Sequence, residues 1–222
     1  MKTKNKLIVL SGGMDSVTAL YEFRNEIALA VTFDYGSKHS IKEKEMAVIN
    51  CKELGIEHII IPLDFIHQYF KSNLLEGQGK IPEGHYQNET MKSTVVPFRN
   101  GIMLSIATGI AESRDLQYVV IANHRGDHSI YPDCRATFID SMNDAMAYGT
   151  YKHVQLFAPY TALTKREIAL RGHERGVPYH KTWSCYKGGE SHCGKCGTCV
   201  ERMEALEGFD PTFYETEIET LI

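Results

Sequence analysis

The sequence predicts an α/β fold, a doubly wound, Rossmann-like parallel sheet of about five strands. Three observations lead to this prediction. Short apolar runs alternate with longer helical segments, the first run ends in a glycine-rich turn, and 222 residues with 43% hydrophobic content are enough for one large core. Alternation of this kind places helices on both faces of a parallel sheet.

The elements follow from this alternation in chain order. Leu7-Ile8-Val9-Leu10 is an apolar run typical of a buried strand, and Val17, Leu20 and Tyr21 in the next segment are spaced for one helix face. The same alternation then repeats along the chain. The predicted strands cover residues 7–10, 29–33, 58–61, 118–122 and 154–158, and the predicted helices cover 15–25, 41–54, 100–113, 137–148 and 164–174.

Two segments depart from this alternation. Residues 67–96 lack periodicity and contain three glycines and a proline, which predicts a surface excursion or an active-site lid. After Pro178, cysteine and glycine dominate, and a short helix is predicted over roughly 200–207. We therefore divide the chain into a nucleotide-binding domain, 1–178, and a zinc-binding C-terminal segment, 179–222, packed on it.

The turn at residues 11–16, Ser-Gly-Gly-Met-Asp-Ser, lies between a predicted strand and a predicted helix. At such a junction, backbone N–H groups and the helix N-terminus form an anion site. The two glycines let the chain approach a phosphate, the serines add hydroxyl donors, and Asp15 can cap the helix or help hold Mg²⁺. The nucleotide-binding candidates here are Leu10, Ser11, Gly12, Gly13, Met14, Asp15 and Ser16.

This turn lacks the Gly-Lys-Ser/Thr ending of a Walker loop. It resembles the pyrophosphate loop of the N-type ATP pyrophosphatases. That resemblance implies cleavage of ATP between its α and β phosphates, with transfer of AMP to an oxygen and release of pyrophosphate. The alternative is an ordinary strand–turn–helix junction, which two glycines flanked by serines and an acid disfavour.

Four closely spaced cysteines form the second strong pattern: Cys185, Cys193, Cys196 and Cys199. Four thiolates can surround one tetrahedral Zn²⁺, and no fifth ligand is evident, so we expect one structural zinc ion per chain. The alternatives are four unrelated thiols or an iron–sulfur cluster. The added Cys185 and the absence of a following x3-Cys-Pro favour zinc over the cluster.

The two other cysteines stand apart from this group. Cys51 falls within a predicted helix and is expected to be a buried, inert thiol. Cys134 lies in a polar turn and has no visible partner, so we expect a structural role for it rather than nucleophilic catalysis.

Composition narrows the class of partner. A net charge of −4 gives no basic field to recruit nucleic acid, and the cysteine segment holds no strong basic run. The first apolar run is too short for a signal peptide, and no segment approaches transmembrane length. We therefore expect a cytoplasmic protein that acts on small molecules and has no membrane or nucleic-acid partner. Association into a homodimer is compatible with the sequence.

Over nearly its whole length the chain resembles the 7-cyano-7-deazaguanine synthases of queuosine biosynthesis. The block Tyr-Pro-Asp-Cys-Arg at 131–135 and the cysteine block are more specific than the loop alone. Phe98 stands where that family usually has glycine, a departure expected to bear on the acceptor pocket. The matching blocks are residues 11–16, 31–36, 96–100, 126–128, 131–135 and 182–186, followed by the remaining cysteines.

The resemblance implies that 7-carboxy-7-deazaguanine, ammonia and ATP react to give the nitrile. A carboxylate oxygen attacks the α-phosphorus, AMP activates the acid, ammonia gives the amide, and a second adenylation drives dehydration. Mg²⁺ accompanies ATP. No length remains for a glutaminase domain, so free ammonia is the expected nitrogen donor.

The matched positions also imply residue roles. Phe33 and Asp34 face the adenosine, and the catalytic candidates are Arg99, Asp127, Asp133 and Arg135. Asn100 caps a helix. For His128 the sequence leaves two roles equally open, a hydrogen-bonded structural histidine and a catalytic one. Lys165 and Arg166 open a helix and are expected on its solvated face.

Two other functions stay open from sequence alone. One is a related adenylating enzyme that forms an amide on another carboxylate. The other is a non-catalytic, zinc-stabilised nucleotide-binding module. ATP-dependent formation of AMP separates the enzymes from the module.

Overall fold

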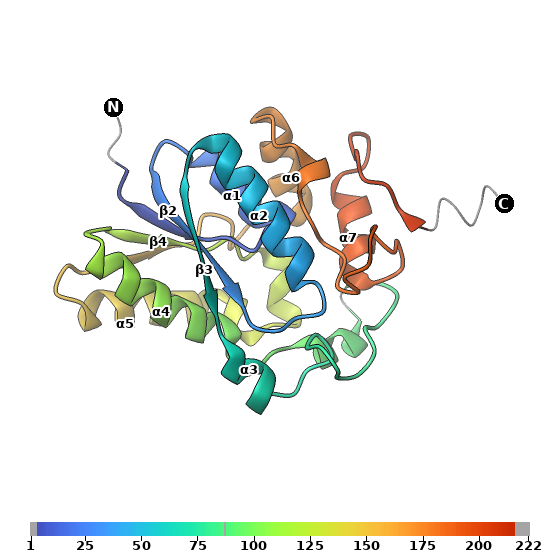
Figure 1. Ribbon diagram of the computed structural model, residues 1–222, viewed down its shortest axis with the longest axis horizontal. Helices are drawn as coiled ribbons and strands as arrows, with labels where there is room; N and C mark the ends of the chain where they lie inside the picture. The colour runs from blue at the N-terminus through green and yellow to red at the C-terminus, as the bar shows by residue number, and fades with distance from the viewer. Residues whose placement is uncertain (1–3, 87, 216–222) are drawn as a thin grey trace.

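A computed structural model describes residues 4–86 and 88–215 and contains a five-stranded, all-parallel sheet (Figure 1). The strand order is β3-β2-β1-β4-β5, with the first strand at the centre. This order confirms the predicted doubly wound fold. The strands are β1 (Lys6–Val9), β2 (Ile27–Asp34), β3 (Glu57–Pro62), β4 (Tyr118–Val120) and β5 (Gln155–Phe157).

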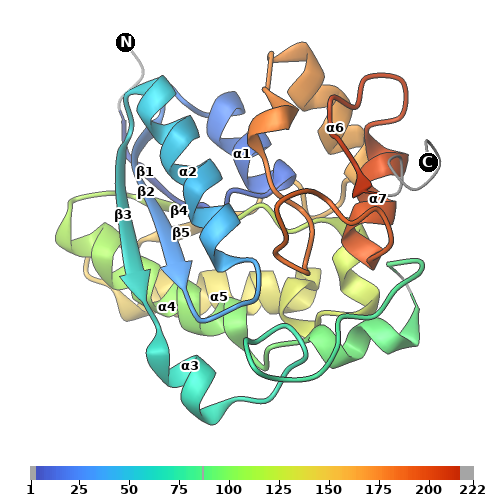
Figure 2. The same cartoon turned by 45° about the vertical axis from the view of Figure 1, so that its right-hand side comes forward.

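Helices cover both faces of the sheet. Figure 2 shows α1 and α2 on one side and α4 and α5 on the other, with α7 beside α6. Short 3₁₀ turns cover Glu89–Thr94, Arg125–Ser129, Pro132–Cys134 and Tyr179–Lys181. The helices are α1 (Met14–Glu22), α2 (Ser40–Leu54), α3 (Asp64–Tyr69), α4 (Arg99–Ser113), α5 (Ala136–Gly149), α6 (Lys165–Glu174) and α7 (Gly197–Ala205).

The central strand is buried on both faces, which explains its unbroken apolar sequence. Leu7 and Ile8 are both fully buried but belong to different clusters. Leu7 packs with Leu104 of α4, and Ile8 packs with Val17 of α1. Successive side chains of a strand point to opposite faces, so each face needs its own layer of helices.

Two expectations need correction at their boundaries. The last helix begins at Gly197, three residues before the predicted start, and its N-cap is Cys196 of the four-cysteine cluster. Gly197 packs tightly, because a Cβ there would lie 3.0 Å from the Met91 sulfur and 3.1 Å from the Tyr86 Cα. For residues 67–96, predicted as a surface excursion or an active-site lid, the first alternative is incomplete, because Tyr86 and Met91 are buried in a cluster with Tyr131.

The C-terminal segment shares the core of the sheet domain. The four cysteines and Trp183 lie in the same cluster as Leu7, while Leu206 lies in the cluster of Ile8. The backbone N–H of Trp183 also donates to the Gly12 carbonyl over 3.0 Å. The segment is therefore packed directly against the glycine-rich loop.

The described residues contain no helix with both the length and the apolar character needed to cross a bilayer.

Gly12 is a glycine of the loop whose replacement should be costly. Its φ is +85°, and a Cβ would lie 2.2 Å from the Glu43 carbonyl oxygen. Gly12→Ala should lower the free energy of unfolding by about 2 kcal/mol or more, measured by urea denaturation. Gly109 is the control, because a Cβ there meets nothing within 4 Å in the middle of α4. Gly109→Ala should raise stability by roughly 0.5–1 kcal/mol. Equal stabilities for the two variants would contradict this account of the loop.

Candidate active site

The glycine-rich loop follows β1 and opens α1, at the carboxyl edge of the sheet. Its two serines hold it together: Ser11 Oγ accepts from the Gly13 N–H over 3.1 Å and lies 3.0 Å from Ser16 Oγ. Ser16 Oγ also lies within hydrogen-bond distance, 3.1 Å, of the Gly13 carbonyl oxygen. The loop is thus ordered by its own side chains, with the N-terminus of α1 directly behind it.

A cavity opens beside this loop, between the strand ends and the C-terminal segment. The structure brings most of the predicted site residues together around it, although they come from distant parts of the chain. The predicted residues that line it are Leu10, Ser11, Gly13, Met14, Asp15, Ser16, Phe33, Arg99 and Asp127.

Two predicted nucleotide contacts do not line the cavity. Gly12 is buried against the backbone of α2, at Glu43, and sets the path of the loop. Asp34 forms an ion pair with Lys44 at the end of β2. Their predicted contact with the nucleotide gains no support from this placement.

Asp133 and Arg135 also lie outside the cavity lining. The Asp133 carboxylate accepts from the Asn100 N–H over 2.8 Å, so it satisfies the first turn of α4. Arg135 is exposed and donates through Nε to the His128 carbonyl over 3.0 Å. Asp133 therefore supports α4, and no contact connects Arg135 to the cavity.

Arg99 begins α4 and presents a half-buried guanidinium to the cavity. Its Nη1 donates to the Tyr35 hydroxyl over 2.9 Å. Within residues 4–86 and 88–215, no carboxylate lies within ion-pair distance of this guanidinium. Burial opposes the charge on Arg99, but the surrounding tyrosines and Asp133 outweigh burial and raise its pKa, so the guanidinium stays charged and can bind an anionic ligand.

Four tyrosines, Tyr35, Tyr86, Tyr131 and Tyr186, form an aromatic wall of the same cavity. Burial raises the pKa of Tyr86 and Tyr186 well above the usual value, so their hydroxyls stay neutral. The Tyr86 hydroxyl donates to Asp127 Oδ1 over 3.0 Å. Flat rings with polar edges suit a flat heterocycle, and these tyrosines were not among the residues predicted from sequence.

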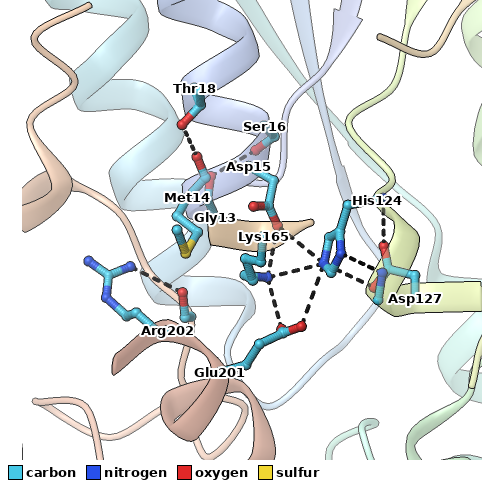
Figure 3. Close-up of polar contacts among 12 residues, drawn as sticks. Gly13, Met14, Asp15, Ser16, Thr18, His124, Asp127, Lys165, Glu201 and Arg202 are labelled. Carbon is cyan, nitrogen blue, oxygen red and sulfur yellow. Dashed lines mark hydrogen bonds and ion pairs between the residues drawn. The ribbon is translucent and has the colours of Figure 1, made fainter. Parts of the chain in front are cut away.

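A buried cluster of charges adjoins the loop (Figure 3). Lys165 Nζ lies 2.9 Å from Asp15 Oδ2 and 3.1 Å from Glu201 Oε2. His124 Nε2 lies 3.4 Å from Asp127 Oδ1. Burial opposes the charge on Lys165, but these carboxylates outweigh burial and raise the pKa of its amine. Burial likewise opposes the Asp127 carboxylate, but His124 and Lys165 lower its pKa.

The expectation of a solvated face for Lys165 and Arg166 was wrong. The Lys165 side chain is only 13% exposed. Arg166 donates to the carbonyls of Ala205 and Glu207, each over 2.8 Å. The start of α6 packs against α7, and this tertiary contact covers both side chains. The sequence of α6 alone gives no sign of it.

His124 joins the charge cluster, whereas the nearby His128 does not line the main cavity. His124 follows β4 at the carboxyl edge, and its Nδ1 accepts from the Gly126 N–H over 3.0 Å. Its place in the loop four residues after the end of β4 is a signal in the sequence that could have found it, because such loops meet at the carboxyl edge of the sheet.

Phe98 does not line the cavity either, contrary to the expected effect on the acceptor pocket. Its side chain is 60% exposed and contacts Phe138 edge-on, with ring centroids 5.8 Å apart. Its φ is +53°, in the left-handed region that glycine adopts freely. Phe98 therefore bears on the backbone at the start of α4 rather than on the lining of the cavity.

The four C-terminal cysteines form a buried site that suits a metal ion. Their sulfur atoms all lie within 4.8 Å of one another, and Cys193 Sγ and Cys199 Sγ are 3.9 Å apart. Four thiolates at 2.3 Å from a tetrahedral ion would be about 3.8 Å apart, so the spacing fits. The Cys196 N–H donates to Cys193 Sγ over 3.3 Å, which also favours a thiolate.

The remaining two cysteines stay outside this metal site. Burial raises the pKa of Cys51 to about 12, as expected for an inert thiol. Cys134 lines the cavity and accepts from Asn100 Nδ2 over 3.2 Å. Burial also raises the pKa of Cys134 well above its usual value, so it is held as a neutral thiol.

Comparison with known proteins agrees with this geometry. Residues 5–210 match the protein family described as queuosine biosynthesis protein QueC. A 7-cyano-7-deazaguanine synthase from Porphyromonas gingivalis is 60% identical over 217 residues, covering 96% of this chain and 99% of that protein. One from Desulfotalea psychrophila is 51% identical over 215 residues, covering 95% and 98%.

The fold and the site define a doubly wound α/β enzyme with a glycine-rich loop at its central strand and a four-cysteine metal site. More particularly, the chain belongs to the QueC family, whose relatives above are named 7-cyano-7-deazaguanine synthases.

Loss of one metal ligand should destabilise the whole domain. Cys196→Ser should reduce bound metal from about one ion per chain to a small fraction, because a buried site needs all four thiolates. The thermal midpoint should fall by about 10 °C, since metal-binding energy at such a site is folding energy. Elemental analysis and calorimetry measure both effects. Cys51→Ala removes a buried thiol away from the cluster and should keep the metal. A metal-free wild-type protein of equal stability would refute the site.

Proposed function

We propose that this protein converts 7-carboxy-7-deazaguanine and ammonia to 7-cyano-7-deazaguanine, with ATP cleaved to AMP and pyrophosphate. The observation that carries the proposal is Arg99, a guanidinium without a carboxylate partner in a tyrosine-walled cavity that also contains the phosphate-type loop. The names of the relatives indicate the deazaguanine substrate, and the glycine-rich loop indicates activation of that substrate by transfer of AMP from ATP. The protein is thus proposed to be a cytoplasmic ligase with ATP-binding and metal-binding sites.

The loop side of the cavity is proposed to hold the triphosphate. Ser11, Ser16 and the N-terminus of α1 offer neutral donors, and Lys165 adds a protonated amine beside Asp15. Asp15 Oδ1 is buried without a hydrogen-bond partner, so one carboxylate oxygen is free to contact Mg²⁺ brought in with ATP. Positive charge here would stabilise the departing pyrophosphate.

The tyrosine side is proposed to hold the deazapurine. Arg99 would pair with the two oxygens of the acid, since its planar fork matches a carboxylate, and the rings of Tyr86 and Tyr186 would contact the base. Asp127 and Asn123 line the same side and can accept from ring N–H groups. Asp133 would contribute by fixing the start of α4, and so the direction of Arg99.

This arrangement supports the chemistry in two rounds. An oxygen of the acid attacks the α-phosphorus of ATP, pyrophosphate leaves, and AMP becomes a good leaving group for ammonia. The resulting amide is adenylated on oxygen in the same place, and loss of AMP and a proton gives the nitrile. The ATP consumed is therefore two molecules for each nitrile.

The cysteine site is proposed to hold one structural zinc ion. All four sulfur atoms are buried, so no position is open to substrate. Zinc fits four thiolates without a redox function, and an iron–sulfur absorption band in the purified protein would overturn this identity.

The decisive experiment incubates the purified protein with 7-carboxy-7-deazaguanine, ammonium and Mg-ATP, with mass detection of all products. We expect the nitrile, with AMP and pyrophosphate. ADP and phosphate would exclude the proposed activation. AMP formed only with other acids would identify a different adenylating enzyme, and nucleotide binding without turnover would identify a binding module.

Arg99→Lys tests the acceptor side. It keeps the charge but removes the planar fork, so kcat/KM for the acid should fall by roughly thirty-fold, equivalent to about 2 kcal/mol. Binding of ATP alone, measured by calorimetry, should change much less. Arg114 follows the other end of the same helix and makes an exposed ion pair with Glu57, so Arg114→Lys is the matched control. Wild-type kinetics for Arg99→Lys would exclude Arg99 from carboxylate recognition.

A further inference from the structure

The segment that carries the metal site also supplies a buried carboxylate to the loop. Glu201 lies on α7, two residues after the metal ligand Cys199, and its side chain is 13% exposed. Its Oε2 lies 3.1 Å from Lys165 Nζ, and its Oε1 lies 3.9 Å from His124 Nε2 (Figure 3). The reaction proposed above assigns Glu201 no part.

Lys165 is held from two sides by this arrangement. Asp15, from the loop, approaches Nζ to 2.9 Å, and Glu201 approaches it from the far end of the chain. A lysine has a flexible four-carbon stem, so one ion pair alone leaves its ammonium several positions. The second carboxylate restricts Nζ to one place beside the loop.

Glu201 is itself rigidly placed. The next residue, Arg202, is fully buried and donates to the Tyr179 carbonyl over 2.7 Å and to Thr182 Oγ1 over 2.8 Å. On the other side, α7 is fixed by Cys196 at its N-cap and by Cys199 in its first turn. The carboxylate is therefore attached to a helix that the metal site and the Arg202 contacts both hold.

We propose that Glu201 is a positioning residue of the nucleotide site: it holds the Lys165 ammonium beside Asp15, so that the amine faces the phosphates when ATP enters the loop. Through the helix that it shares with Cys199, Glu201 makes the geometry of the loop depend on the four-cysteine site. The inference rests on the proposed function for the identity of the nucleotide, whereas the contacts of Glu201 do not depend on it.

Glu201→Gln tests this role because the side chain keeps its size and loses its charge. We expect kcat/KM for ATP to fall at least about ten-fold, with weaker ATP binding in the absence of the acid. Metal content should match the wild type. The control is Glu204→Gln on the same helix, where the side chain is 56% exposed, and its kinetics should be unchanged. A lower metal content, or a KM change for the acid alone, would overturn the proposal.

A double-mutant cycle with Lys165→Met separates positioning from a general structural effect. If Glu201 acts through Lys165, Glu201→Gln should cause no further loss in the Lys165→Met background. The same ten-fold loss in both backgrounds would overturn the proposal. If Lys165→Met does not fold, the test is the affinity of Glu201→Gln for ATP, measured by calorimetry. An affinity equal to that of the wild type would overturn the proposal.

The same assays separate the two levels of inference. If the wild-type protein forms no AMP, the proposed function is excluded. If the wild-type protein forms AMP and Glu201→Gln is equally active, only the proposed role of Glu201 is excluded.

Discussion

One buried ammonium connects the three parts of the site. Lys165 Nζ lies between Asp15 of the loop and Glu201 of α7, while its own backbone begins α6. Taking these charges out of water costs several kcal/mol for each ion, and only close pairing offsets that cost. The cluster is therefore favourable only while the loop, α6 and α7 keep their places. This mutual dependence joins the cysteine segment to the sheet.

Arg99 shows the opposite arrangement within the same cavity. Lys165 has carboxylates at 2.9 and 3.1 Å, whereas the hydrogen bond that Arg99 makes in the described part of the chain is to the neutral Tyr35 hydroxyl. A cation in direct ion pairs is part of the fold, whereas a cation with no carboxylate in direct contact can still pair with an acidic ligand. In the proposed function, Lys165 therefore lies on the side assigned to the phosphates, where its charge is already balanced, and Arg99 lies on the side assigned to the acid, which would supply the missing direct partner.

The sequence predicts those parts of the site that are contiguous along the chain. The loop at 11–16 and the cysteine cluster have local patterns, and the parallel sheet follows from apolar runs that are buried on both faces. Lys165 and the tyrosines come from separate segments, and a lysine that opens a helix looks solvated until its neighbouring helix is placed. The early start of α7 at Gly197 was missed for a related reason, because its N-cap and first turn belong to the buried four-cysteine cluster, where apolar periodicity gives no signal.

The tyrosine wall also bears on how an activated acid would survive. An acyl-adenylate reacts with water as well as with ammonia, so the acceptor side must limit access by water. Tyr35, Tyr86 and Tyr131 are each no more than 5% exposed, and the backbone of Trp183 ties the C-terminal segment to the loop at Gly12. Burial keeps the Tyr86 hydroxyl neutral, so the wall adds no negative charge to repel the acid. The segment that carries the four cysteines therefore also lines the cavity in which the acid would be activated, through Trp183, Ser184 and Tyr186.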